Sequence, residues 1–242
     1  MKNLLLYLVD KYKGDRYLMN KGLGSLDQVT RRGLLEIMNK YKNLNFKSLT
    51  VLDENYYTEF FALKSPPLIV FYYGNWNLME AKNKIYLLNE IDCEQTQKLF
   101  NENLSHLVEN CTIVTNNFAS QSEFIKVLKQ HNARIIYIAS EGLDTVDLSE
   151  YNSENNLIIS QYPLKTHPKR HHFKEANILA SLIAKQLIIF SSNKITPMNG
   201  IINQFIENGK PVNCFPGLSL DDGNNFLVKN GANLITSLED CI

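Results

Sequence analysis

The chain of 242 residues lacks the features by which common enzymes and metal proteins are recognised. Its four cysteines lie far apart and form no CxxC pair; they are Cys93, Cys111, Cys214 and Cys241. This spacing argues against a disulfide framework or structural zinc, and we expect reduced thiols in a cytoplasmic protein. The sequence also has no glycine-rich phosphate loop, no GxSxG elbow and no HExxH helix. The usual signals of a nucleotide-binding enzyme, a serine hydrolase and a metalloprotease are therefore missing.

An excess of one charge and long apolar runs are missing as well. Lys and Arg total 25 and Asp and Glu total 25, which gives a pI near 7.0. Any binding of nucleic acid must therefore come from a local patch of charge. No apolar run approaches the roughly 18 to 20 residues that span a bilayer, and the first ten residues lack a signal-peptide cleavage site. We expect no membrane span.

What the sequence does have is an alternation of short apolar runs and helical segments after an initial helical stretch. Strands are predicted at 68–73, 85–88, 112–115, 134–139, 157–160, 186–190 and 211–215, and helices at 94–109, 120–131, 176–184 and 198–208. Nearly continuous apolar runs are typical of parallel strands covered on both faces. We predict an α/β protein in which a small helical N-terminal module (1–55) precedes a Rossmann-like domain (56–242) with a doubly wound, mostly parallel sheet.

The most distinctive stretch lies between the predicted strand 157–160 and the helix that follows. Four cations and three histidines fall within the ten residues 165–174, in a chain whose net charge is zero. Loops after the strands of such a sheet carry its ligands. Basic side chains neutralise phosphates while an aromatic ring, here Phe173, stacks on a base, which is how single strands are held without sequence readout. The alternative is a loop that only adds solubility.

The histidines of this stretch, His167, His171 and His172, raise the alternative of a metal site. Prolines at positions 163 and 168 argue against a helix that would align the first two. Metal ligands normally converge and are held by supporting hydrogen bonds, so we expect no metal here. We also find no nucleophile paired with a base, and we expect a binding protein without catalytic residues or a cofactor.

Several segments, in consistent order from about residue 50 to 242, resemble the DNA-processing protein A family, also called Smf. The matching segments are SPPLIVFYYGN (65–75), GLD (142–144), SQYPLKTHP (160–168), HF (172–173), FPG (215–217), GNN (223–225), NGA (230–232) and TSLED (236–240). In the family, the phenylalanine that matches Phe173 borders the DNA pocket. The chain stops where the Rossmann-like domain ends, so we expect the C-terminal winged helix of many members to be absent.

The resemblance implies a cytoplasmic protein that binds single-stranded DNA, delivers it to the RecA recombinase during uptake and recombination, and forms a homodimer. The candidate DNA-binding residues are Lys165, Lys169, Arg170, His172, Phe173, Lys174, Asn177 and Asn225.

The chain departs from the family where the family binds anions. Asn89, Glu90 and Ile91 replace its Gly-Ser-Arg, and residues 115–122 lack its glycines and aspartate. Residues 174–177 replace its Arg-Arg-Asn-Arg stretch. Two alternatives therefore stay open. One is a diverged paralog with weak or no DNA binding that acts as a regulator, and the other is a nucleotide-binding Rossmann-like protein.

Overall fold

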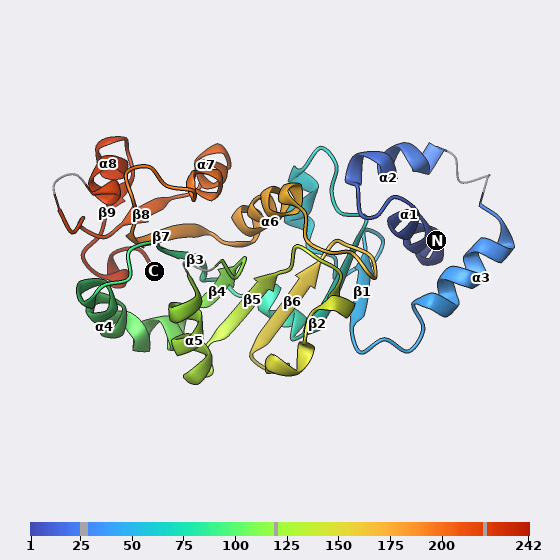
Figure 1. Cartoon of the computed structure of the whole chain (residues 1–242), viewed down its shortest axis with the longest axis horizontal. Coiled ribbons are helices and arrows are strands. Elements are labelled where there is room, and N and C mark those ends of the chain that lie inside the picture. The colour runs from blue at the N-terminus through green and yellow to red at the C-terminus, as the bar shows by residue number, and fades with distance from the viewer. Residues whose placement is uncertain (25–28, 119–120, 220–221) are drawn as a thin grey trace. The chain divides into compact units, whose positions relative to one another are not determined.

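The computed structural model describes residues 1–24, 29–118, 121–219 and 222–242 (Figure 1). The chain divides into two compact units. The first unit comprises Met1–Trp76 and Ala139–His172, and the second comprises Asn77–Ile138 and Phe173–Ile242. The predicted boundary near residue 55 falls inside the first unit, because a strand before it pairs with a strand after it there.

The first unit begins with the N-terminal module, whose described residues form three α-helices. They are α1 (Lys2–Lys11), α2 (Arg16–Gly22) and α3 (Arg31–Lys40). Two of them start at a side-chain cap: the Asp15 carboxylate accepts the Leu18 N–H, and the Thr30 hydroxyl accepts the Gly33 N–H. Such caps satisfy amide groups that the first helical turn leaves unpaired.

Three antiparallel strands make up the sheet in the described part of the first unit. In spatial order they are β1 (Lys47–Thr50), β2 (Ile69–Gly74) and β6 (Asn156–Ser160). Gly74 ends β2 with a φ of +96°, and a Cβ there would lie 2.1 Å from the Asn156 carbonyl oxygen. Only glycine fits this close approach. Short 3₁₀ turns complete the unit at Thr58–Ala62, Leu143–Thr145 and Leu148–Glu150, and another begins at its edge, Trp76–Glu80.

The second unit holds a parallel sheet whose order, among the described residues, is β5-β4-β3-β7-β8-β9. Its strands are β3 (Lys84–Asn89), β4 (Thr112–Thr115), β5 (Arg134–Ile138), β7 (Gln186–Ser191), β8 (Val212–Cys214) and β9 (Asn233–Leu234). In the described part of the chain, these strands pair with one another in parallel. The chain winds outward from β3 in one direction and from β7 in the other, which confirms the predicted Rossmann-like, doubly wound fold.

Helices cover both faces of this parallel sheet. They are α4 (Glu94–Asn110), α5 (Ser122–Gln130), α6 (Arg170–Ile183), α7 (Asn199–Glu207) and α8 (Gly223–Lys229), and the 3₁₀ turn Leu238–Asp240 ends the chain. In Figure 1, α4 and α5 lie on one side of the strands and α7 and α8 on the other. Helix α6 starts six residues before the predicted Ala176, because the Lys169 carbonyl accepts the His172 N–H and opens a turn directly after Pro168.

Asn224 fixes the start of α8 against the ends of two strands. Its fully buried side-chain amide donates to the carbonyl oxygens of Phe190 and Phe215, each at 3.0 Å. Its Oδ1 accepts the Ser192 hydroxyl at 2.8 Å. The neighbouring Gly223 lies so close to the chain that a Cβ would stand 2.5 Å from the Ser192 carbonyl oxygen. The GNN segment therefore serves packing and hydrogen bonding inside the second unit.

Replacing Asn224 with Leu should destabilise the protein strongly. The change roughly keeps the side-chain volume, but two buried carbonyl groups and one hydroxyl lose their hydrogen-bond partner. This loss should lower the unfolding free energy by about 2 to 4 kcal/mol. Urea unfolding followed by circular dichroism measures the loss. The exposed Asn230, replaced by Ala at the end of the same helix, is the control and should change the free energy by less than about 0.5 kcal/mol. Equal losses in both variants would contradict this role of Asn224.

Candidate nucleic-acid interface

The basic stretch presents cations that the protein itself does not neutralise. Lys165, Lys169 and Arg170 in the first unit and Lys174 in the second are all exposed. Across the described ranges of the chain, none of the four charged groups takes part in an ion pair or a hydrogen bond. Unpaired surface cations are available to phosphate groups, whose binding releases condensed counterions.

The Gly-Leu-Asp segment holds the basic loop in place within the first unit. Both carboxylate oxygens of Asp144 accept the backbone N–H of Lys165, at 3.0 and 2.9 Å. Lys165 has a φ of +58°, a conformation that an unbranched side chain adopts only at a cost. The Gly142 N–H bonds to the Thr166 carbonyl at 2.9 Å, and a Cβ on Gly142 would lie 2.5 Å from the Pro163 carbonyl oxygen. The hydrogen bonds of Gly142 and Asp144 thus fix the backbone conformation at Lys165.

His172 anchors the loop from inside the first unit and has little surface to offer a ligand. It is 2% exposed, and its ring stacks on Tyr162 with centroids 3.9 Å apart. Its Nδ1 lies 2.8 Å from the Ser140 carbonyl oxygen, so this nitrogen carries the proton. We therefore assign His172, predicted to contact DNA, a positioning role at the base of the loop.

The N-terminal module also reaches the basic loop. The Tyr41 hydroxyl donates to Asp10 at 3.1 Å and accepts the Leu164 N–H at 3.4 Å, while Lys40 forms an ion pair with the same carboxylate. Burial, and secondly the negative charge of Asp10, raise the pKa of Tyr41 far above its usual value. The phenol therefore keeps its proton at neutral pH, and its lone pairs remain free to hold the loop.

In the second unit, the start of α6 places an aromatic ring beside an exposed cation. Phe173, next to Lys174, is 41% exposed, and its ring lies beside that of Phe118 in the loop after β4, with centroids 6.4 Å apart. One turn further along α6, Asn177 Oδ1 accepts a hydrogen bond from Asn116 Nδ2 at 2.6 Å. A half-exposed aromatic face is suited to stacking on a base.

Asn225 is occupied by its own loop. Its Oδ1 accepts the Gly217 N–H at 3.3 Å, and its Nδ2 donates to the Ser219 carbonyl at 2.7 Å. A Cβ on Gly217 would lie 2.7 Å from the Asn225 amide, so the Phe-Pro-Gly segment is shaped to this contact. Asn225 braces the loop after β8, and its place in a DNA contact stays a prediction.

The sequence reasoning missed the residues that position the loop: Tyr41, Asp10 and Asp144. The Gly-Leu-Asp match did mark Asp144, but nothing in the pattern showed that its carboxylate bonds to the backbone at residue 165. Tyr41 is separated from Leu164 by 123 residues, and no local signal links them.

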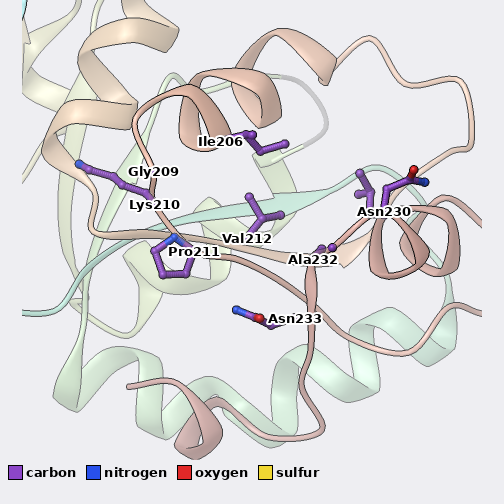
Figure 2. Close-up of a pocket in the computed structure, with 10 residues that line it drawn as sticks. Ile206, Gly209, Lys210, Pro211, Val212, Asn230, Ala232 and Asn233 are labelled. Atoms are coloured by element: carbon purple, nitrogen blue, oxygen red, sulfur yellow. The ribbon is translucent and has the colours of Figure 1, made fainter.

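A pocket of about 400 Å³ lies in the second unit, where β8 and β9 begin (Figure 2). Ile206, Val212 and Leu227 give it apolar walls. The charged lining residue, Lys210, already donates to the carbonyls of Leu182 and Ala184 at 2.7 and 2.5 Å. The cation of this pocket is therefore already bonded to the chain, which makes the pocket a poor site for phosphate.

Candidate metal sites and membrane-spanning helices are both absent from the residues that the structure describes. No group of three or more His, Cys, Asp or Glu side chains is placed to hold a metal ion there. No helix in that part of the chain is long and apolar enough to cross a membrane.

Known proteins resemble this chain over most of its length. The DNA processing protein DprA of Streptococcus pneumoniae is 23% identical over 208 residues, which cover 81% of this chain and 73% of its own length. That of Bacillus subtilis is 19% identical over 219 residues, covering 86% and 74%.

Two solved structures show the same fold. The X-ray structure of DNA processing protein A from S. pneumoniae gives a TM-score of 0.72 at 19% identity, covering 99% of this chain and 94% of that one. The Helicobacter pylori protein, whose single-stranded DNA binding mode is described, gives 0.66 at 18% identity, covering 82% and 94%. The model of the family described as DNA recombination-mediator protein A matches residues 47–242, and the chain therefore belongs to that family.

Proposed function

We propose that this protein binds single-stranded DNA without sequence preference and passes it to a RecA recombinase during DNA uptake and recombination. The observation that carries the proposal is the set of exposed, unpaired cations at Lys165, Lys169, Arg170 and Lys174, with the half-exposed ring of Phe173 beside the last of them. Membership of the DNA recombination-mediator protein A family supports it. The single-stranded DNA binding of the H. pylori relative supports it as well.

The chemistry of these groups favours binding to single strands, without preference for a particular base sequence. Lysine and arginine neutralise phosphates, which every nucleotide carries, and their binding energy falls as salt competes. An aromatic ring stacks on the face of a base, which every base has and a duplex hides.

The proposal has further parts that rest on the family resemblance. The protein acts as a homodimer in the cytoplasm, contacts RecA directly, and does not itself cleave DNA or hydrolyse nucleotides. The absence of a nucleophile–base pair from the sequence motifs supports the last part. Turnover of ATP or DNA that co-purifies with the protein and stops when a chelator is added would contradict it.

Changing Lys165, Lys169, Arg170 and Lys174 together to Ala should remove most of the affinity for single-stranded DNA. Each lost phosphate contact should lower the magnitude of the salt slope by about 0.7, so the total fall should reach up to about 3. Fluorescence anisotropy with an oligothymidylate at salt concentrations between about 50 and 200 mM measures both quantities.

The matched control removes the same charge from exposed lysines outside the basic stretch. Its four substituted residues are Lys42, Lys82, Lys98 and Lys126. The control should keep most of the affinity and the slope. If both variants lose affinity equally, a specific patch is excluded. If the wild-type chain binds no single-stranded DNA even at low salt, the proposal is wrong and the regulator alternative is favoured.

Replacing Phe173 with Ala should weaken DNA binding by about 1 to 3 kcal/mol and leave the salt slope unchanged, because stacking involves no phosphate. Since the side chain is 41% exposed, the unfolding free energy should fall by much less than the roughly 3 to 5 kcal/mol expected when a buried ring is removed. Phe226, which is 48% exposed on α8, supplies the matched control and should bind as the wild type does when changed to Ala. A Phe173 variant that melts several degrees lower yet binds DNA normally would exclude the stacking role.

A further inference from the structure

At the start of the loop after β3, the carboxylate of Glu90 is held by two donors from the loop after β7. Its Oε2 accepts the backbone N–H of Asn193 at 2.9 Å, and its Oε1 accepts the Thr196 hydroxyl at 2.6 Å. Both are charge-assisted hydrogen bonds, which are the stronger kind. β3 and β7 are the neighbouring strands at which the winding of the sheet reverses, and ligands of such sheets bind at this point, beyond the carboxyl ends of the strands.

The two donors are set in position by bonds that do not involve Glu90. The Thr196 hydroxyl, 8% exposed, accepts the Met198 N–H at 2.8 Å, which directs its own proton toward the carboxylate. The 192–193 segment is held from the other side by Gly223, whose N–H bonds to the Ser192 carbonyl at 3.1 Å. Since these contacts stay when Glu90 changes, the donors should keep their directions and form a cradle for an anion.

We propose that Glu90 is a built-in anion that fills this cradle and keeps phosphate out of it. The ligand that the cradle takes once the carboxylate is removed is a phosphate, free or as the phosphodiester of a single strand. Glu90 is then a specificity-determining residue: its negative charge and its two hydrogen bonds exclude phosphate from this edge of the second unit. The part that concerns DNA rests on the proposed function, whereas the part that concerns free phosphate does not.

Chemical rescue tests the cradle directly. Glu90→Ala loses two hydrogen bonds and should melt below the wild type, and inorganic phosphate should then raise its Tm saturably. At a concentration about ten times its Kd, phosphate should raise the Tm by about 3 to 6 °C relative to chloride at equal ionic strength. The wild type should show no such phosphate-specific rise, because its cradle is filled.

Asp92→Ala is the matched control. Asp92 lies two residues away in the same loop and carries the same charge, but it bonds to the side chain of Gln97 and not to the cradle. This variant should behave as the wild type does toward phosphate. If phosphate stabilises it as much as Glu90→Ala, the effect comes from net charge and the proposal is wrong.

A second readout locates the binding. In amide-resolved NMR, the Asn193 signal of Glu90→Ala should move on phosphate titration with the same Kd as the Tm effect, and that of the wild type should stay still. Glu90→Gln, which keeps the shape and one acceptor oxygen, is used in the same titration if Glu90→Ala does not fold. If neither variant shows a phosphate-dependent shift at Asn193, Glu90 only ties two loops together and the proposal is overturned.

The DNA measurement keeps this inference apart from the proposed function. Glu90→Ala should bind an oligothymidylate more tightly than Asp92→Ala, with a salt slope steeper by about 0.7 for one added phosphate contact. Phosphate rescue without any DNA binding by the wild type would leave the cradle intact and refute the proposed function. Normal DNA binding without phosphate rescue would refute the cradle alone.

Discussion

The parallel pairing of β3 with β7 is the constraint on which the second unit depends. The Ser191 hydroxyl at the end of β7 donates to Asn89 Oδ1 at 2.6 Å and accepts the Ile91 N–H at 2.8 Å. These bonds fasten the start of one crossover to the end of a strand 102 residues later. Because the chain winds away from this pair in both directions, every loop at the carboxyl edge takes its position from it. The hydrogen bonds of Ser191 with Asn89 and Ile91 therefore fix the edge of the sheet at which a ligand can bind.

The first unit uses a different device for its exposed loop. There, one carboxylate holds the backbone of the residue that carries the first cation, and a buried histidine anchors the other end. The charged side chains themselves are left without partners inside the described part of the chain. Separating the groups that position a loop from the groups that bind lets the backbone be rigid while the cations stay solvated.

The sheet was predictable from the sequence because parallel strands that are buried on both faces have nearly continuous runs of apolar residues. Strand β4 matches its predicted bounds, β3 is one residue longer than predicted at each end, and β7 is one residue longer at its C-terminal end. The exceptions have physical reasons: β1 is a short, partly exposed strand, and β9 is two exposed residues at an edge. Neither buries enough apolar surface to leave a pattern. Helix α8 was missed because its first residues, Gly223 and Asn224, are poor helix formers whose positions are fixed by tertiary contacts.

The N-terminal module lies almost entirely before the residues that the family model matches, yet its Tyr41 touches the backbone of the basic loop at Leu164. This contact links the position of the loop to the folding of the module. A chimaera that joins the module of one relative to the remaining chain of another would have to carry Asp10, Lys40 and Tyr41 together with a loop of matching length. The loop therefore depends on the module that supports it, even though the two are separated by more than a hundred residues of sequence.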